Sequence, residues 1–167
     1  MTPVPTTPAP TPVLRPEDHF HVGIVAEDFD VTKDRLSRLF GFEWGAEMGG
    51  PTELTLSTGD TVIDFRCAYQ RSAGPAPRVE IVQRVPGTLW EPTAGSGIHH
   101  FGYWSDDVAA DTAELERHGY VTEATSRSPD GSLFFTYLHS AEQTAPRVEL
   151  VSRSARPFLE NAWSQGQ

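Results

Sequence analysis

The sequence repeats itself, and an internal repeat strongly limits the folds open to a chain of 167 residues. The segment 77–84 (PRVEIVQR) recurs at 146–153 as PRVELVSR, with six of eight positions identical. A second pair lies upstream, where 21–28 (HVGIVAED) and 100–107 (HFGYWSDD) share the histidine, the glycine and the final aspartate. Because both pairs occur in the same order, the chain is predicted to be a duplicated module of roughly 65–80 residues.

The two copies share a predicted order of elements, βαβββ. A run rich in β-forming residues opens each copy, at 20–26 and 98–104. A helical pattern follows and ends at a glycine, Gly41 or Gly119, which can adopt the left-handed conformation that terminates a helix. Three strand-like runs complete each copy, so the fold class is α+β. The candidate helix N-caps are Asp28 or Asp30 and Asp106 or Asp107, and the strand runs are 42–48, 53–69 (with a turn at Gly59-Asp60) and 78–84, then 120–126, 132–139 and 147–152.

The repeat divides the chain into four parts. These are a Pro/Thr-rich tail at 1–17, module 1 at 18–90, module 2 at 91–155 and a C-terminal tail at 156–167. Six of the first sixteen residues are proline, a composition that excludes a helix or an inner strand and favours a flexible polyproline-II tail. Packing of this tail on a partner subunit is the alternative. The C-terminal tail is expected to hold a short helix.

Charge and cysteine content exclude several functional classes. The chain has 13 basic and 23 acidic residues, a net charge of −10, which disfavours binding to nucleic acid or to an anionic membrane surface. The sequence has no apolar run long enough for a transmembrane helix, and its first residues do not resemble a signal peptide. A single cysteine, Cys67, excludes an intramolecular disulfide and a Cys-rich zinc site. We therefore expect a cytoplasmic protein that acts on a small molecule.

Four side chains indicate a metal site. Strand side chains alternate between faces, so His21, Glu80, His100 and Glu149 are expected together on the sheet face away from the helices. The opposite face is more uniformly apolar and should meet the helices; it carries Val22, Ile24, Val79, Ile81, Phe101, Tyr103, Val148 and Leu150. Duplicated modules place equivalent positions symmetrically, so two histidines and two glutamates can converge on one divalent cation. Imidazole and carboxylate donors suit Zn, Ni, Co, Mn or Fe(II).

The repeated motifs resemble the vicinal oxygen chelate superfamily, and the resemblance extends over about residues 19–153. That superfamily holds glyoxalase I, methylmalonyl-CoA epimerase, extradiol dioxygenases, fosfomycin-resistance enzymes and bleomycin-binding proteins. The resemblance implies paired βαβββ modules that form a curled, eight-stranded mixed sheet around a metal-binding cleft. It also implies ligands on the first and last strand of each module, which are His21 and Glu80, then His100 and Glu149 in this chain.

The same resemblance implies a lyase or isomerase. The metal would bind a substrate carbonyl and acidify the adjacent C–H, and a carboxylate would move the proton through an enolate. Glu149 is the first candidate for this base and Glu80 the second. The candidates for substrate binding are Trp104, Arg78, Arg147 and His139.

Other residues near the motifs have simpler interpretations. By strand alternation His99 points to the helix side and is interpreted as structural. His19 either supports the site or is exposed, and Cys67 is interpreted as a small core residue.

Two alternatives of other classes stay open. An Fe(II)-dependent ring-cleaving dioxygenase would use two histidines and one glutamate, and the fourth ligand candidate, Glu80, argues against it. A non-catalytic drug- or metabolite-binding resistance protein would need no metal, and all four ligand candidates argue against it. A transferase that inactivates an antibiotic is a further alternative. The modules can pair within one chain or across a homodimer.

Overall fold

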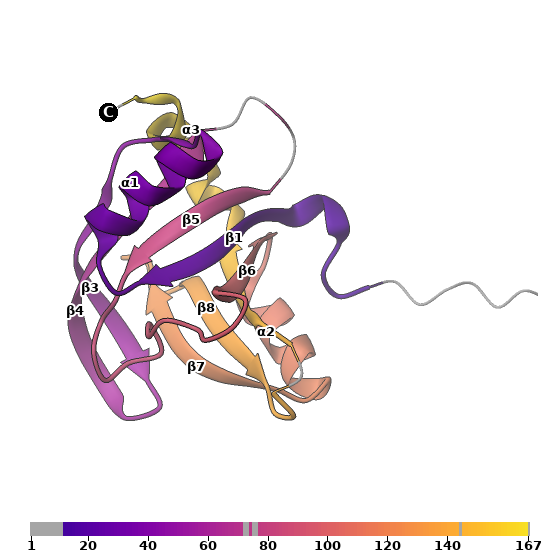
Figure 1. The fold of residues 1–167 in the computed structure, drawn as a ribbon. Coiled ribbons are helices and arrows are strands. Elements are labelled where there is room, and N and C mark those ends of the chain that lie inside the picture. Colours follow the sequence, from indigo (N-terminus) through magenta and orange to yellow (C-terminus); the bar gives the residue numbers. More distant parts are fainter. Residues whose placement is uncertain (1–11, 72–73, 75–76, 144, 167) are drawn as a thin grey trace, which may run out of the picture.

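The structure of the protein, a computed structural model, describes residues 12–71, 74, 77–143 and 145–166 (Figure 1). Most of the predicted N-terminal tail, residues 1–11, lies outside the described residues. The chain then enters a short 3-10 helix, η1 (Pro16–Asp18), that leads directly into the first module. No described helix is long and apolar enough to cross a membrane.

Each module contains the predicted elements in the predicted order. Module 1 consists of β1 (His19–Ala26), α1 (Phe29–Phe40), β2 (Glu43–Trp44), β3 (Met48–Leu56), β4 (Gly59–Arg71) and β5 (Arg78–Gln83). Module 2 consists of β6 (Ile98–Ser105), α2 (Val108–Arg117), β7 (Tyr120–Arg127), β8 (Leu133–Ser140) and β9 (Arg147–Ser152). A second 3-10 helix, η2 (Arg153–Ala155), and a final helix, α3 (Arg156–Ser164), follow module 2.

The strands form one curled sheet. Within the described residues nine strands pair in the order β2-β4-β3-β7-β8-β9-β6-β1-β5, and a further pairing of β4 with β5 joins the two ends. The pairs β1–β5 and β6–β9 are parallel and the others are antiparallel, so the sheet is mixed. Eight of these strands make up the two βαβββ modules, which confirms the predicted fold class.

The ninth strand, β2, differs from the prediction. The strand expected over 42–48 is reduced to two residues. The N–H of Gly45 still donates to the carbonyl of Tyr69 in β4, but the N–H of Ala46 donates to the carbonyl of Ala162 in α3. A Cβ on Gly45 would lie only 2.7 Å from the carbonyl oxygen of Ala162. The run predicted over 53–69, with a turn at Gly59-Asp60, is a hairpin of β3 and β4 that begins earlier, at Met48, and has its turn at 57–58.

The modules pair with each other inside a single chain. Strands β1 and β6 run antiparallel side by side, with β5 outside β1 and β9 outside β6. The first and last strands of both modules are therefore four consecutive strands of the sheet, in the order β9-β6-β1-β5. In the described structure, the two modules therefore pair within one chain.

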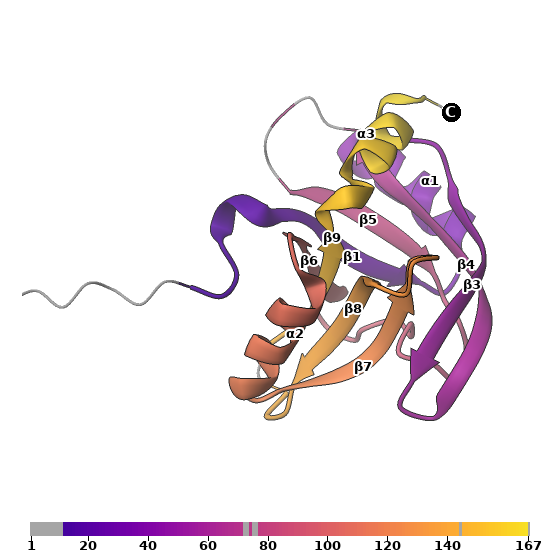
Figure 2. The same ribbon diagram turned by 180° about the vertical axis from the view of Figure 1, so that it is seen from behind.

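Both helices begin and end as their sequences predict. The carboxylates of Asp28 and Asp107 accept hydrogen bonds from the N–H groups of Val31 and Ala110, and these bonds cap the first turns of α1 and α2. The residue after α1, Gly41, has a φ of 68° in the left-handed region. The helices cover the outer face of the sheet (Figures 1 and 2).

The predicted apolar face lies beneath these helices. Ile81, with Ile24 and Val79, packs against Phe29 and Leu36 of α1. The corresponding cluster under α2 contains Val108, Leu115, Leu138, Val148 and Leu150, with Tyr103 beside it. Burial of these side chains leaves the other face of the same strands for the inside of the curled sheet.

A third cluster fills part of that inside. It is rich in aromatic rings, and its buried members include Phe20, Tyr69, Trp90, Trp104, Tyr137 and Trp163. Helix α3 contributes Leu159 and Trp163 to this cluster, so the C-terminal segment closes one end of the curled sheet (Figure 2).

Candidate metal centre

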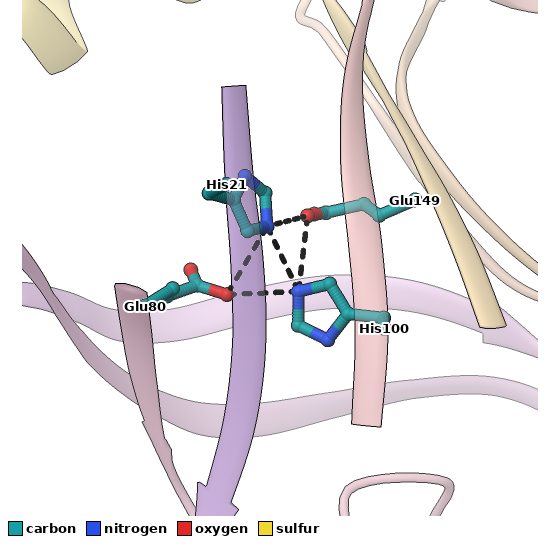
Figure 3. A group of neighbouring side chains, drawn as sticks. All are labelled: His21, Glu80, His100 and Glu149. Carbon is teal, nitrogen blue, oxygen red and sulfur yellow. Dashed lines mark hydrogen bonds and ion pairs between the residues drawn. The ribbon is translucent and has the colours of Figure 1, made fainter. Parts of the chain in front are cut away.

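Four side chains meet inside the curled sheet at the junction of the modules. They are His21, Glu80, His100 and Glu149, and one ligand atom of each lies within 4.8 Å of the others (Figure 3). The two Nε2 atoms of the histidines are 2.9 Å apart. Each carboxylate Oε2 lies 3.0 Å from one Nε2 and 3.5 Å from the other. The four side chains that the repeat singles out therefore form one compact cluster.

The strand register explains this convergence. Glu80 and Glu149 come from β5 and β9, the outer two of the four consecutive strands, and the histidines come from the inner two, β1 and β6. Gly23 on β1 lies opposite both Glu80 and His100, and Gly102 on β6 lies opposite Glu149. Both carboxylates therefore extend toward the histidine rings over a backbone that carries no side chain.

The two glycines make room for the two imidazole rings. A Cβ on Gly23 would lie 1.8 Å from Cε1 of His100, and a Cβ on Gly102 would lie 1.8 Å from Cε1 of His21. Each module thus contributes a His-x-Gly segment in which the histidine occupies the space above the glycine of the other module. The repeated His and Gly are visible in the sequence, but this reciprocal role depends on the antiparallel register of β1 and β6.

The cluster is deeply buried, and burial governs its charges. Burial raises the pKa of Glu149 to about 8, and the nearby Glu80 carboxylate adds to the shift. Burial opposes ionisation of Glu80 as well, but the two histidine rings and the Tyr69 hydroxyl outweigh it and lower its pKa to about 2. Burial also lowers the pKa of His21 to about 4. Without a cation, two buried carboxylates repel each other and one of them holds a proton.

A divalent cation fits this set of donors in charge, chemistry and spacing. Two carboxylates and two neutral imidazoles balance a charge of +2. In the described part of the chain, Oε2 of Glu80 and Oε2 of Glu149 form no hydrogen bond although both are buried, and such atoms are costly to leave unpaired. Metal–ligand bonds of about 2.0–2.1 Å separate neighbouring ligand atoms by about 2.8–3.5 Å. The Nε2–Nε2 and Nε2–Oε2 distances of 2.9–3.5 Å lie in this range.

A hydrogen-bond chain behind His100 sets its tautomer. Nε2 of His99 donates to the carbonyl oxygen of Leu89 at 2.7 Å, because a carbonyl can only accept. Burial lowers the pKa of His99 to about 3, so its ring is neutral and its Nδ1 carries no proton. That Nδ1 therefore accepts from Nδ1–H of His100, 2.9 Å away, and the lone pair of His100 lies on Nε2, which faces the cluster. His99, interpreted from the sequence as structural, is thus bonded to a member of the cluster.

Two tyrosines that the sequence analysis did not single out support the glutamates. The hydroxyl of Tyr69 on β4 helps to lower the pKa of Glu80, and the hydroxyl of Tyr137 on β8 partly offsets the rise in the pKa of Glu149. Their rings meet the edges of the His21 and His100 rings at centroid distances of 5.3 and 5.1 Å. The repeat could have identified them, because each tyrosine lies in the strand just before the strand of its glutamate, in β4 before β5 and in β8 before β9.

One cavity reaches the cluster. It has a volume of about 480 Å³, within the range typical of small-molecule sites. Among the described residues of the cluster, the two carboxylates line this cavity and the two histidines, which are fully buried, do not. The cavity is built mainly from β3, β4, β8 and α3, and its apolar lining includes Met48, Phe65, Phe134, Phe135, Phe158 and Leu159. The carboxylate side of the cluster is therefore the side that a ligand can approach.

The comparison with known families agrees with this architecture. Residues 20–137 match the family described as the glyoxalase/bleomycin resistance protein/dioxygenase superfamily. The chain belongs to this superfamily. The predicted resemblance is therefore confirmed, and the match runs from β1 of the first module into β8 of the second.

Solved structures of other superfamily members share the fold. A methylmalonyl-CoA epimerase in complex with methylmalonyl-CoA and NH4+ is similar over 83% of this chain and 95% of that chain, with 24% identity and a TM-score of 0.56. The same figures describe a Streptomyces coelicolor epimerase variant in complex with 2-nitronate-propionyl-CoA. The Mycobacterium tuberculosis epimerase is similar over 81% of this chain and 87% of its own, with 19% identity and a TM-score of 0.52. No curated protein matches the chain by sequence.

The four residues predicted to bind substrate lie away from the described lining of the cavity that reaches the cluster. Trp104 is buried and stacks on Phe20 at a centroid distance of 3.7 Å. The guanidinium of Arg78 lies over the Trp163 ring. Arg147 and His139 both approach the carboxylate of Glu123, at 2.5 and 3.5 Å, beside a separate polar cavity. In the described structure, none of Trp104, Arg78, Arg147 and His139 lines the cavity that reaches the cluster.

Proposed function

We propose that this superfamily member is a divalent-metal-dependent enzyme, a lyase or isomerase that moves a proton next to a carbonyl group of a small molecule. The observation that carries the proposal is the meeting of the cavity with the two carboxylates of the cluster, Glu80 and Glu149. A buried His/Glu set open to a cavity on its acidic side can hold a cation and expose a base to the same ligand.

The proposed ligands are His21, Glu80, His100 and Glu149, and Zn, Ni, Co or Mn would suit them. A bound divalent cation would act as a Lewis acid that withdraws electron density from a substrate carbonyl. Residues behind the ligands would orient them, since His99 fixes the tautomer of His100 and the rings of Tyr69 and Tyr137 pack against His21 and His100. One chain supplies all four ligands, so the proposed site does not need a homodimer.

Glu149 is the proposed base, and Glu80 is the second candidate. The Glu149 side chain is 8% exposed and that of Glu80 is 3% exposed, so Glu149 is the more accessible from the cavity. Its carboxylate would accept a proton from the carbon next to the substrate carbonyl and return it to that carbon or to a neighbouring one. The apolar lining would keep bulk water away from the carbon that loses the proton, and the protonated carboxyl group could exchange its proton with solvent between turnovers. The single buried cysteine suits the cytoplasmic location that we propose.

Metal content of the purified, tag-free protein tests the proposal. We expect about one divalent ion per chain after reconstitution, lost in His100→Ala and retained in His118→Ala, whose ring is 62% exposed on the outside of α2. Wild-type protein without metal, or equal metal content in His100→Ala, would refute the proposed site.

The reaction type needs a second measurement. The loaded protein, incubated in D2O with small carbonyl compounds, is expected to exchange the proton next to the carbonyl. Iron as the retained metal, together with oxygen consumption in the presence of a catechol, would support the dioxygenase alternative instead.

A further inference from the structure

We infer that the substrate of this site is a small, uncharged, ring-sized apolar molecule with an oxygen donor, and not a coenzyme A ester or another polyanion. The inference rests on the proposed function, because the oxygen donor is assigned to the proposed metal. It comes from three properties of the cavity: its apolar walls, its balance of charge and the lack of free serine and threonine hydroxyls on its described lining.

Several aromatic rings lie on the walls of the cavity. Phe134 and Phe135 come from β8 and Phe65 comes from β4, so rings face the cavity from two sides of the curled sheet. Phe158, in the first turn of α3, is 64% exposed and also lines the cavity. A ring bound in the cavity could contact these side chains and bury part of Phe158. Removal of the apolar surfaces of the ring and of Phe158 from water would favour binding.

The charges on the lining nearly cancel. Apart from the two glutamates of the cluster, the charged residues that line the cavity in the described structure are Glu53 and Arg127. A divalent cation would neutralise the carboxylates of Glu80 and Glu149, which leaves one negative and one positive side chain. An uncharged ligand would therefore meet no net charge, whereas a polyanion would find one cation for several negative groups.

Two of the cations outside the lining, Arg66 and Arg147, are bonded to acidic partners. Arg66, in β4, is bonded to Asp30 and Glu47 and lies over the ring of Phe29, under α1. Arg147 is bonded to Glu123. Neither is placed to bind phosphate groups of a ligand that enters through this cavity. The related epimerases are described in complexes with coenzyme A esters, so this cavity points to a different ligand.

The serine and threonine hydroxyls on the described lining are already bonded to the backbone. The hydroxyl of Thr52 donates to the carbonyl of Gly50, and the hydroxyl of Ser126 donates to the carbonyl of Glu53. They offer little specific recognition to a sugar or a nucleotide. The polar end of the ligand therefore belongs at the cluster and its apolar end belongs among the phenylalanines.

Two probes that share one chelating group separate these properties. Benzohydroxamate carries a phenyl ring and acetohydroxamate a methyl group on the same pair of oxygen donors. We expect the metal-loaded protein to bind benzohydroxamate at least about tenfold more tightly than acetohydroxamate, because the phenyl ring would be buried in the cavity. Acetyl-CoA in excess should not displace it. Both results are read by calorimetry on the full chain.

A matched pair of variants locates the ring. Phe158→Ala, at the cavity, should weaken benzohydroxamate binding roughly three- to tenfold and leave acetohydroxamate unchanged. Phe40→Ala is the control, since Phe40 is 65% exposed at the end of α1 and is not on the cavity lining. Both residues are exposed, so neither variant should prevent folding.

The outcomes distinguish the two proposals. Metal binding together with equal affinity for both hydroxamates, or displacement by acetyl-CoA, would overturn the substrate class and leave the metal site intact. Failure of the wild-type protein to bind any divalent metal would overturn the proposed function and this inference with it. A ring preference that Phe158→Ala and Phe40→Ala reduce equally would also overturn the inference.

Discussion

The ring of His100 lies where a side chain on Gly23 would begin, with Cε1 of the ring 1.8 Å from the position of a Cβ. The same relationship holds between His21 and Gly102. Two strands from different modules thus fit together only because each carries a histidine opposite a glycine. This reciprocal fit places both Nε2 atoms at the centre of the cluster and makes the glycines as necessary to it as the histidines.

Gly23→Ala is expected to displace His100. The added methyl group cannot share space with the ring, and overpacking of this kind costs typically about 1–3 kcal/mol of stability. Because the ring must move, affinity for a divalent metal should fall by at least about tenfold. Urea unfolding and metal titration measure the two effects. Gly166→Ala is the control, since a Cβ there meets the flexible end of Arg71, and metal affinity unchanged in Gly23→Ala would contradict the expected displacement.

Removal of the bond behind His100 should weaken metal binding without removing a ligand. His99→Phe deletes the acceptor of the His100 Nδ1–H bond, and loss of such outer partners typically lowers metal affinity about 10–100-fold. Nitrogen NMR shifts of the histidine rings would show whether His100 changes tautomer. His118→Phe, at an exposed ring, should have neither effect. If His99→Phe lowers stability but keeps both metal affinity and tautomer, the ring is only a packing residue.

Much of the fold, and the four residues of the cluster, could be predicted from the internal repeat in the sequence. Strand alternation placed the histidines and glutamates on the inner face because both modules have the same register between first and last strands, seen in the parallel pairs of β1 with β5 and β6 with β9. The helix N-caps at Asp28 and Asp107 could be predicted for a different reason, because a cap depends only on the residues of one helical turn.

The walls of the cavity were not readable from the sequence. They come from β3, β4, β8 and α3, which meet because the sheet curls and α3 folds back over it. Phe158 belongs to the C-terminal segment outside the repeat, so no repeated motif marked it. Arg147 and His139 were candidates for substrate binding from their places in the predicted strands. In the structure both contact Glu123 on β7, beside another cavity. Such pairings depend on tertiary contacts that alternation alone does not predict.

The buried carboxylates should make the metal-free protein less stable than a variant that cannot bind metal. Glu149→Gln removes a carboxyl group whose pKa is raised first by its burial and then by the adjacent carboxylate of Glu80. We expect a gain of roughly 1–3 kcal/mol in unfolding free energy at alkaline pH, with loss of metal affinity. Glu123→Gln, which breaks a partly buried ion pair with Arg147, should bring no such gain. Equal stability of wild-type and Glu149→Gln protein in a chelator would argue against charge repulsion in the cluster.

The stability of the metal-free protein should be greatest near the ordinary histidine pKa of 6.5. The pKa values of His21 and His99 are lowered to about 4 and about 3, so the folded protein binds fewer protons than the unfolded chain below 6.5 and loses stability as pH falls. The pKa of Glu149 is raised from 4.5 to about 8. The folded protein therefore keeps a proton that the unfolded chain has released, and stability falls as pH rises toward 8.

A divalent metal should remove the alkaline decline, because it takes the place of the proton held by Glu149. The stabilisation by metal is therefore expected to grow as pH rises from about 6.5 to about 8. Urea unfolding at several pH values, with chelator and with excess zinc, measures the loss of stability on the acid side and on the alkaline side. In chelator the alkaline decline should be absent from Glu149→Gln, and the acid decline should be smaller in His99→Phe. An alkaline decline of equal slope in Glu149→Gln would assign it to groups outside the cluster.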